Sequence, residues 1–225
     1  LVIYVDGVRF GPHHVIVAIG VDCEGRKHVL GLREGATENA VVVTDLLTDL
    51  VSRGVNPAWR RLFVIDGSKA LRAGIDAVFG ANHPVQRCRN HKVENVMGYL
   101  PEELKDQVKT VMKAAYRLDA KEGMAKLKQQ AHWLQSEYPS AAASLLEGLE
   151  ETFTINRLGL PPKLRRCLGT TNIVESPTAG VRLRTRRVTR WKDGAMVLRW
   201  AATALLATEK QFRRIIGFQE LWTLK

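Results

Sequence analysis

Apolar, β-branched runs separated by short turns dominate the first third of the chain. Three such runs cover residues 1–9, 13–21 and 27–33, and the last two are separated by a turn at residues 22–25. Runs of this length and composition predict three strands in an antiparallel meander. Two later apolar runs, at residues 61–65 and 84–88, predict a fourth and a fifth strand.

Helical spacing of apolar residues begins after the third strand. Val42, Leu46, Leu47 and Leu50 have helical spacing, which predicts a helix that opens at Thr37-Glu38-Asn39. Residues 152–169 contain Gly159 and Gly169 with two prolines between them, and predict a connecting segment. The helices predicted by the whole pattern cover these segments: 37–54, 68–79, most of 90–151 with breaks at Pro101 and Pro139, 171–187 and 195–216.

The order of these elements predicts the fold class. Three strands, a helix, a strand, a helix and a strand, followed by helices, indicate an α/β protein with a mixed five-stranded sheet. The strand–helix–strand units after the meander should be parallel crossovers. Helices are then expected to flank this sheet.

Composition narrows the class of protein. The 225 residues are 45% hydrophobic and 25% charged, which excludes a disordered chain, a collagen and a membrane bundle. No apolar run approaches the roughly 20 residues of a transmembrane helix. The first apolar run lacks a basic leader, so no signal peptide and a cytoplasmic location are expected. Three widely spaced cysteines fit a reducing compartment.

The positive charge is concentrated in the last third of the chain. The net charge is +11, and residues 152–225 carry this whole excess. Such a block is typical of a surface that binds a polyanion, and DNA is the expected partner. A solvated helix face or an acidic protein partner would also explain it. The candidate DNA-binding residues are Lys163, Arg165, Arg166, Arg182, Arg184, Arg186, Arg187 and Arg190.

Two aspartates occupy matching places in the predicted strands. Asp6 follows the apolar run of the first strand, Asp66 follows that of the fourth, and each precedes a glycine at which the backbone can turn. If these strands are neighbours, the two carboxylates meet at one edge of the sheet. Mg²⁺ prefers such oxygen ligands. Each Asp-Gly pair is also a common turn dipeptide, which is the alternative interpretation.

A third carboxylate lies in the arginine-rich segment. Glu175 is the only acid between residues 163 and 190, and on a helix it would share one face with Ala179, Arg182 and Arg186. That face would combine a metal ligand with two phosphate-binding cations.

Two other interpretations of Glu175 remain open. Asn172 and Glu175 have the spacing of a capping box, in which the glutamate only closes a helix start. Alternatively, Ser176 is the N-cap of a helix that begins at Pro177, which would place Glu175 just before that helix.

Cys88 and His91 form half of a possible zinc site. No second pair of suitable ligands is evident in the sequence. Local packing, at the point where the fifth strand passes into a helix, is therefore the favoured interpretation of this pair.

Together these segments resemble the catalytic region of mutator-type transposases of bacterial insertion sequences. The resemblance covers nearly the whole chain in five ordered blocks. The blocks are Tyr4-Val5-Asp6-Gly7, Leu32 to Asn39, Phe63 to Leu71, Val85 to Lys92, and Thr171 to Ser176 with the following arginine-rich helix and Arg190 to Gly194.

The resemblance implies a ribonuclease-H-like fold and a DDE-type site. Asp6, Asp66 and Glu175 would bind two Mg²⁺ ions, for which Mn²⁺ can substitute, and Cys88 and His91 belong to a family motif without an assigned role. An all-helical insertion precedes the glutamate helix in this family. The resemblance therefore implies a first part of the ribonuclease-H-like core at residues 1–100, the insertion at 101–165 and a second part of the core at 166–225. An N-terminal DNA-binding region precedes the first catalytic strand in the family, so the resemblance implies that this sequence is a fragment or a truncated product without that region.

The implied function is metal-dependent DNA cleavage and strand transfer that moves an insertion sequence. The partners would be the terminal repeats, target DNA and a second copy of this chain in a homodimer. The protein would act in the bacterial cytoplasm, at the nucleoid. The alternatives are a truncated, catalytically inactive DNA-binding remnant that interferes with full-length transposase, and a stand-alone ribonuclease-H-like nuclease.

Overall fold

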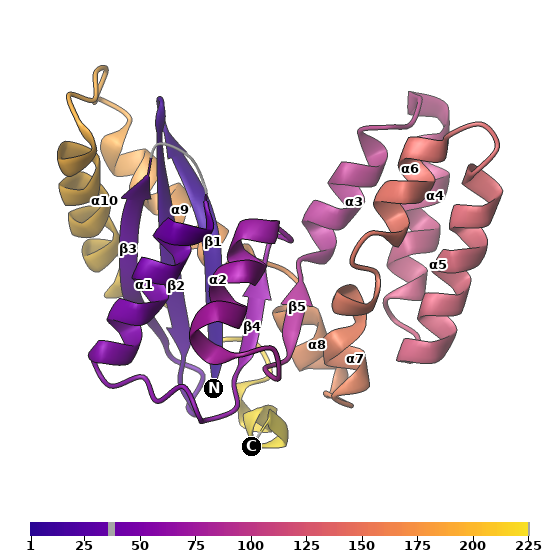
Figure 1. The fold of residues 1–225 in the computed structure, drawn as a ribbon, viewed down its shortest axis with the longest axis horizontal. Coiled ribbons are helices and arrows are strands. Elements are labelled where there is room, and N and C mark those ends of the chain that lie inside the picture. Colours follow the sequence, from indigo (N-terminus) through magenta and orange to yellow (C-terminus); the bar gives the residue numbers. More distant parts are fainter. Residues whose placement is uncertain (36–38, 225) are drawn as a thin grey trace.

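The computed structural model describes residues 1–35 and 39–224. A mixed five-stranded sheet forms its centre, with the strand order β3-β2-β1-β4-β5 (Figure 1). The strands β1 (Val2–Phe10), β2 (His13–Val21) and β3 (Lys27–Gly35) form the predicted antiparallel meander, while β4 (Leu62–Ile65) and β5 (Val85–Arg87) continue the sheet in parallel with β1. This arrangement confirms the α/β class and is that of a ribonuclease-H-like fold.

Helices flank the sheet and follow it along the chain. In the described part of the chain, no helix is both long enough and apolar enough to cross a membrane. The helices are α1 (Ala40–Ser52), α2 (Lys69–Phe79), α3 (Arg89–Met97), α4 (Glu102–Ala115), α5 (Ala120–Leu134), α6 (Pro139–Leu146), α7 (Thr154–Arg157), α8 (Pro162–Leu168), α9 (Asn172–Thr185) and α10 (Gly194–Glu209), with the 3₁₀-helices η1 (Glu150–Phe153) and η2 (Phe218–Leu224).

Alternation along the strands divides the sheet residues between two hydrophobic cores. Ile3 of β1 points to one face and packs in a cluster with Leu46 of α1 and residues of α2. Its neighbour Tyr4 points to the other face and packs with Val174 of α9 and Val197 of α10. Successive side chains of a strand point to opposite faces, so both faces of the sheet are covered and buried.

A third hydrophobic core lies in a helical unit beside the sheet, which holds α3 to α6 (Figure 1, right). Its buried residues run from Val93 in α3 to Phe153 in η1. Leu164 and Leu168 of α8 instead pack in the cluster of the sheet. The unit therefore has a core of its own, and the sequence-based division at residues 100 and 165 stays a prediction.

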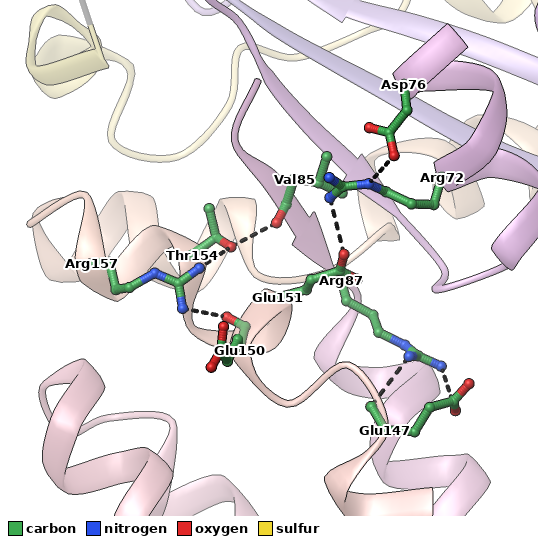
Figure 2. A network of polar contacts seen from close by, with 9 residues as sticks. All are labelled: Arg72, Asp76, Val85, Arg87, Glu147, Glu150, Glu151, Thr154 and Arg157. Carbon is green, nitrogen blue, oxygen red and sulfur yellow. Dashed lines mark hydrogen bonds and ion pairs between the residues drawn. The ribbon is translucent and has the colours of Figure 1, made fainter. Parts of the chain in front are cut away.

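A buried arginine connects this helical unit to the sheet. Arg87, the last residue of β5, donates to the Glu147 carbonyl at 3.2 Å and to its carboxylate at 3.1 Å (Figure 2). Gly67 and Gly148 both lie against its side chain, and a Cβ at either glycine would collide with Arg87. These glycines have positive φ angles of 106° and 60°. Arg87 thus holds the loop before η1 close to the Asp66-Gly67 turn.

A second set of polar contacts fixes η1 and α7 to the same edge. Arg72 of α2 bonds to Asp76 at 2.9 Å and to Glu151 at 3.0 Å, and the Thr154 hydroxyl donates to the Val85 carbonyl at 2.6 Å (Figure 2). Residues more than 65 positions apart are connected in this way. The helical unit is therefore attached to the sheet through α2 and β5.

Several sequence-based boundaries are wrong. Residues 152–169 are not a plain connecting segment, because they contain α7 and α8. Pro162 occupies the first turn of α8, where a missing N–H costs nothing. The region 90–151 has a further break, with Asp119 as N-cap of α5. The predicted start of the first helix at Thr37-Glu38 lies outside the described residues, and Asn39 is the N-cap of α1.

Candidate active site

The sheet brings Asp6 and Asp66 to adjacent strands, as predicted. β1 and β4 pair in parallel with Val5 opposite Ile65, so the next residue along each strand is an aspartate. Asp6 is 7% exposed, and Asp66 is half-buried. Because parallel strands reach the same edge of the sheet at their carboxyl ends, both aspartates lie at one edge.

The two Asp-Gly pairs are not equivalent. The prediction that the chain turns at Asp6-Gly7 is wrong, because β1 continues to Phe10 in its ladder with β2. Gly67 does take a positive φ of 106° and leads the chain out of β4. The difference arises because β1 is paired on both sides and its hairpin with β2 extends beyond the short β4.

Backbone N–H groups hold both carboxylates in place. The Gly7 N–H donates to Asp6 Oδ1 at 2.9 Å, and the Ser68 N–H donates to Asp66 Oδ1 at 2.7 Å. Ser68 also caps α2, since its hydroxyl accepts from Ala70 and Leu71. The start of α2 therefore fixes the loop that carries Asp66.

The environment of Asp6 is unfavourable for its charged form. Burial is the main cause, and the neighbouring Asp66 charge is the second; together they raise the pKa of Asp6 to about 7. Two carboxylates this close repel each other unless a proton or a cation lies between them. The pair is therefore suited to bind a divalent cation.

This pKa predicts how stability changes with pH. The folded protein holds the Asp6 proton more tightly than the unfolded chain, so the free energy of unfolding falls as pH rises from about 4 to about 7. In metal-free buffer above pH 7, the free energy of unfolding of Asp6→Asn should be about 2–4 kcal/mol higher than that of the wild type, because asparagine stays neutral. Urea unfolding at pH 5 and pH 8 measures this. Asp45→Asn, an exposed control, should show no such gain, and an advantage of Asp6→Asn that does not grow with pH would contradict the prediction.

Glu175 lies in the first turn of α9 and is exposed. The capping-box interpretation is wrong, because the N-cap is Thr171, and the Thr171 hydroxyl donates to Glu175 Oε1 at 2.8 Å. The interpretation with Ser176 as N-cap is also wrong, because Pro177 lies inside the helix. Pro177 has no N–H to donate within the helix, and α9 nevertheless continues through it to Thr185.

Glu175 is close to Cys88 and His91. One ligand atom of each residue lies within 4.8 Å of the other two. Within the described ranges 1–35 and 39–224, Asp6, Asp66 and Glu175 do not form such a group. In this structure the Glu175 carboxylate is directed to Thr171, beside Cys88 and His91.

Cys88 and His91 lie where β5 passes into α3, which agrees with the predicted local placement. Cys88 is the buried N-cap of α3. Burial raises the pKa of its thiol, but hydrogen bonds from His91 and Thr171 outweigh this effect and bring the pKa below its usual value. The hydrogen bond to Cys88 raises the pKa of His91 to about 9, and the charges of Asp6 and Asp66 add to the shift.

Sequence reasoning missed Thr171. Its side chain is fully buried and contacts Cys88, His91 and Glu175. The available signal was a threonine four residues before the glutamate at a helix start, but nothing in the sequence placed Cys88 beside it.

The candidate DNA-binding residues fall on two helices and the loop after the second. α8 carries Lys163, Arg165 and Arg166, of which Arg165 is half-buried. On α9, Glu175 and Arg182 are both exposed, and the prediction that they share one face stays a prediction. The basic residues of α9 and the loop after it are exposed and have no ion pair among the described residues: Arg182, Arg184, Arg186, Arg187 and Arg190.

Comparison with known proteins identifies the family. The profile described as "Transposase, Mutator family" matches residues 5–214, which is nearly the whole chain. The chain belongs to the Mutator family of transposases. The sequence-based resemblance is thereby confirmed, and the matched range contains most of β1, the helical unit and α9.

Named relatives of this Mutator-family chain come from insertion sequences. It is 29% identical over 174 residues to the transposase for insertion sequence element IST2 of Acidithiobacillus ferrooxidans, an alignment that covers 77% of this chain and 57% of the relative. A probable transposase of Corynebacterium diphtheriae is 30% identical over 80% of this chain and 52% of its own length. The transposase for IS1081 of Mycobacterium tuberculosis is 27% identical over 92% and 50%. The chain spans about half the length of these relatives.

Proposed function

We propose that this chain carries the catalytic site of an insertion-sequence transposase, with Asp6, Asp66 and Glu175 as its DDE triad. The observation that carries the proposal is the parallel pairing of β1 and β4, which sets Asp6 beside Asp66 in a family whose named members are transposases. The reaction would be cleavage of DNA at the ends of an element and transfer of the freed strand to target DNA.

The residues present fit a pair of Mg²⁺ ions, with Mn²⁺ as a substitute. Asp6 and Asp66 supply hard oxygen ligands, and burial together with the Asp66 charge raises the pKa of Asp6, a cost to the charged form that a bound cation would relieve. When bound, the ions activate the attacking hydroxyl and stabilise the leaving oxygen. The three carboxylates hold these ions, and rotation of Glu175 away from Thr171 would complete the ligand set.

Exposed arginines along α9 would hold the DNA backbone. Arg182 lies two helical turns after Glu175, about 10 Å along the helix axis at 1.5 Å per residue. DNA bound along this face would therefore pass the catalytic edge. The proposal includes both terminal-repeat and target DNA as partners and a homodimer as the active form.

Cleavage of a labelled terminal-repeat duplex tests the proposal. The protein is incubated with the duplex and Mg²⁺ or Mn²⁺, and strand scission is followed on a denaturing gel. Metal-dependent cleavage supports the DDE site. Metal-independent binding without scission supports the second candidate, a DNA-binding form that does not cut, which the hydrogen bond between Glu175 and Thr171 favours.

The salt dependence of DNA binding should fall when arginines of α9 are removed. Each phosphate contact contributes about 0.9 to the slope of log K against log salt concentration. Replacing both Arg182 and Arg186 with glutamine should therefore lower the slope by about 2. Fluorescence anisotropy titrations at several salt concentrations measure this. Arg26→Gln is the control because Arg26 already pairs with Glu24 at 2.8 Å, and an equal loss in this control would contradict the assignment.

A further inference from the structure

A second group of metal-ligand side chains lies beside the proposed catalytic pair. Cys88 is at the junction of β5 and α3, His91 is in the first turn of α3, and Glu175 is in the first turn of α9. Their thiol, imidazole and carboxylate atoms all lie within 4.8 Å of one another. The Cys-x-x-His pair, which is half of a zinc site by spacing, thus gains a third ligand from a helix more than 80 residues away.

The three side chains converge on a single buried hydroxyl. Thr171 Oγ1 is 2.8 Å from Glu175 Oε1, 3.4 Å from Cys88 Sγ and 3.4 Å from His91 Nδ1. A hydroxyl has one proton and can donate to only one of these acceptors at a time. The arrangement therefore gathers a thiol, an imidazole and a carboxylate around one point, and Thr171 can donate to only one of them.

Backbone hydrogen bonds hold the elements that carry these ligands. The Cys88 N–H donates to the Ile65 carbonyl at 2.7 Å, directly before Asp66. The Arg89 N–H donates to the Gly169 carbonyl at 2.9 Å, two residues before Thr171. The start of α3 is thus anchored to both β4 and the segment that leads into α9. Ligands on such fixed elements lose little conformational freedom when they bind an ion.

The ligand atoms of Cys88, His91 and Glu175 favour a different cation than the carboxylates of Asp6 and Asp66 do. Sulfur and imidazole ligands favour Zn²⁺, whereas Mg²⁺ requires oxygen ligands. Tetrahedral Zn²⁺ with bonds of roughly 2.0–2.3 Å sets its ligand atoms roughly 3.4–3.6 Å apart. The observed separations of up to 4.8 Å need only a contraction of about 1 Å to reach this geometry. Glu175 is exposed and can adjust by side-chain rotation, and its exposed side leaves a fourth position for water.

We propose that Cys88, His91 and Glu175 form a Zn²⁺ site with one open coordination position, separate from the Asp6–Asp66 pair. Thr171 would hydrogen-bond the bound carboxylate and fix its orientation, as partners of metal ligands commonly do. The consequence for catalysis rests on the proposed function. Because one carboxylate cannot complete both sites, Zn²⁺ would withdraw Glu175 from the DDE triad and inhibit cleavage.

Cobalt titration tests the site without any activity measurement. Co²⁺ replaces Zn²⁺ in sulfur-containing sites, and thiolate ligation gives an intense near-ultraviolet charge-transfer band. The reduced full chain should develop this band with one equivalent of Co²⁺ and lose it when Zn²⁺ is added. Cys88→Ser should abolish the band, whereas Cys167→Ser, the matched control at a half-buried free cysteine, should retain it. Absence of the band, or its persistence in Cys88→Ser, overturns the proposal.

The exposed third ligand provides a variant with little risk to folding. Glu175→Gln keeps the size of the side chain and removes the anionic ligand. Its affinity for Zn²⁺, measured by competition with a chromophoric chelator, should fall at least tenfold while the cobalt–thiolate band remains. An unchanged affinity excludes Glu175 as a ligand and overturns the three-residue site.

Inhibition of cleavage separates this proposal from the proposed function. In Mg²⁺, micromolar Zn²⁺ should suppress cleavage by the wild type, and the ratio of rates with and without Zn²⁺ should return toward one in Cys88→Ser. Cys88-dependent cobalt binding in a protein that never cleaves supports the zinc site and defeats the proposed function. Cleavage by a protein with no Cys88-dependent metal binding supports the function and defeats the zinc site.

Discussion

Asp66→Asn is expected to reduce Mg²⁺-dependent DNA cleavage by at least about 10³-fold, which corresponds to about 4 kcal/mol of lost transition-state stabilisation. Asparagine keeps the shape of the side chain and its acceptor oxygen for the Ser68 N–H, which donates to Asp66 at 2.7 Å. The substitution removes the negative charge that a divalent cation requires. Gel-based cleavage of the labelled duplex at saturating Mg²⁺ measures the loss.

The control for this result is an aspartate outside the site. Asp45 is exposed on α1, so Asp45→Asn should cleave as the wild type does. Binding of DNA in metal-free buffer should also be unchanged in Asp66→Asn, since the exposed arginines of α9 remain. Cleavage by Asp66→Asn within tenfold of the wild type would contradict the DDE assignment.

Phe153→Ala is expected to lower the free energy of unfolding by about 3–5 kcal/mol. Phe153 is completely buried in the core of the helical unit, and its ring centroid lies 5.3 Å from that of Tyr116. The Arg89 guanidinium lies 5.8 Å from the same ring. Gly123 has no side chain at the point where Phe153 reaches α5, so neighbouring residues cannot fill the space. Urea unfolding followed by circular dichroism measures the change.

Two further variants define the cause of this loss. Phe153→Leu keeps most of the apolar volume and should cost markedly less than alanine. Leu146→Ala removes a side chain that is 45% exposed in the same unit and should change stability by less than about 1 kcal/mol. If Phe153→Ala costs no more than Leu146→Ala, the helical unit does not depend on this core.

The strands were predictable because their pattern is local. β2 has the predicted bounds, and the other strands differ by one or two residues at their ends. β-Branched runs and turn residues encode this information within a few positions. The turn expected at Asp6-Gly7 was wrong because the hairpin partner of β1, which is not visible in a local pattern, keeps this segment extended.

Pairing between distant segments was predictable only in part. The local pattern left the pairing of β1 with β4 as a condition, and the resemblance to a family with a DDE-type site led to the expectation that Asp6 lies next to Asp66. The start of α9 was ambiguous, because Asn172, Ser176 and Pro177 each suit a helix terminus. Packing of Val174 and Val181 into the core decided it, since tertiary burial outweighs the cost of an internal proline.

The sequence by itself determined the fold class, the family resemblance and the two aspartates on neighbouring strands, because strand patterns and motif spacing are properties of the chain alone. The tertiary structure decided that Glu175 lies with Cys88, His91 and Thr171, and that Arg87 connects the helical unit to the catalytic edge. The contacts of Arg87 with Glu147 and of Cys88 with Thr171 join residues 60 or more positions apart. Their distances depend on how whole helices pack against the sheet, and local spacing carries no information about that packing.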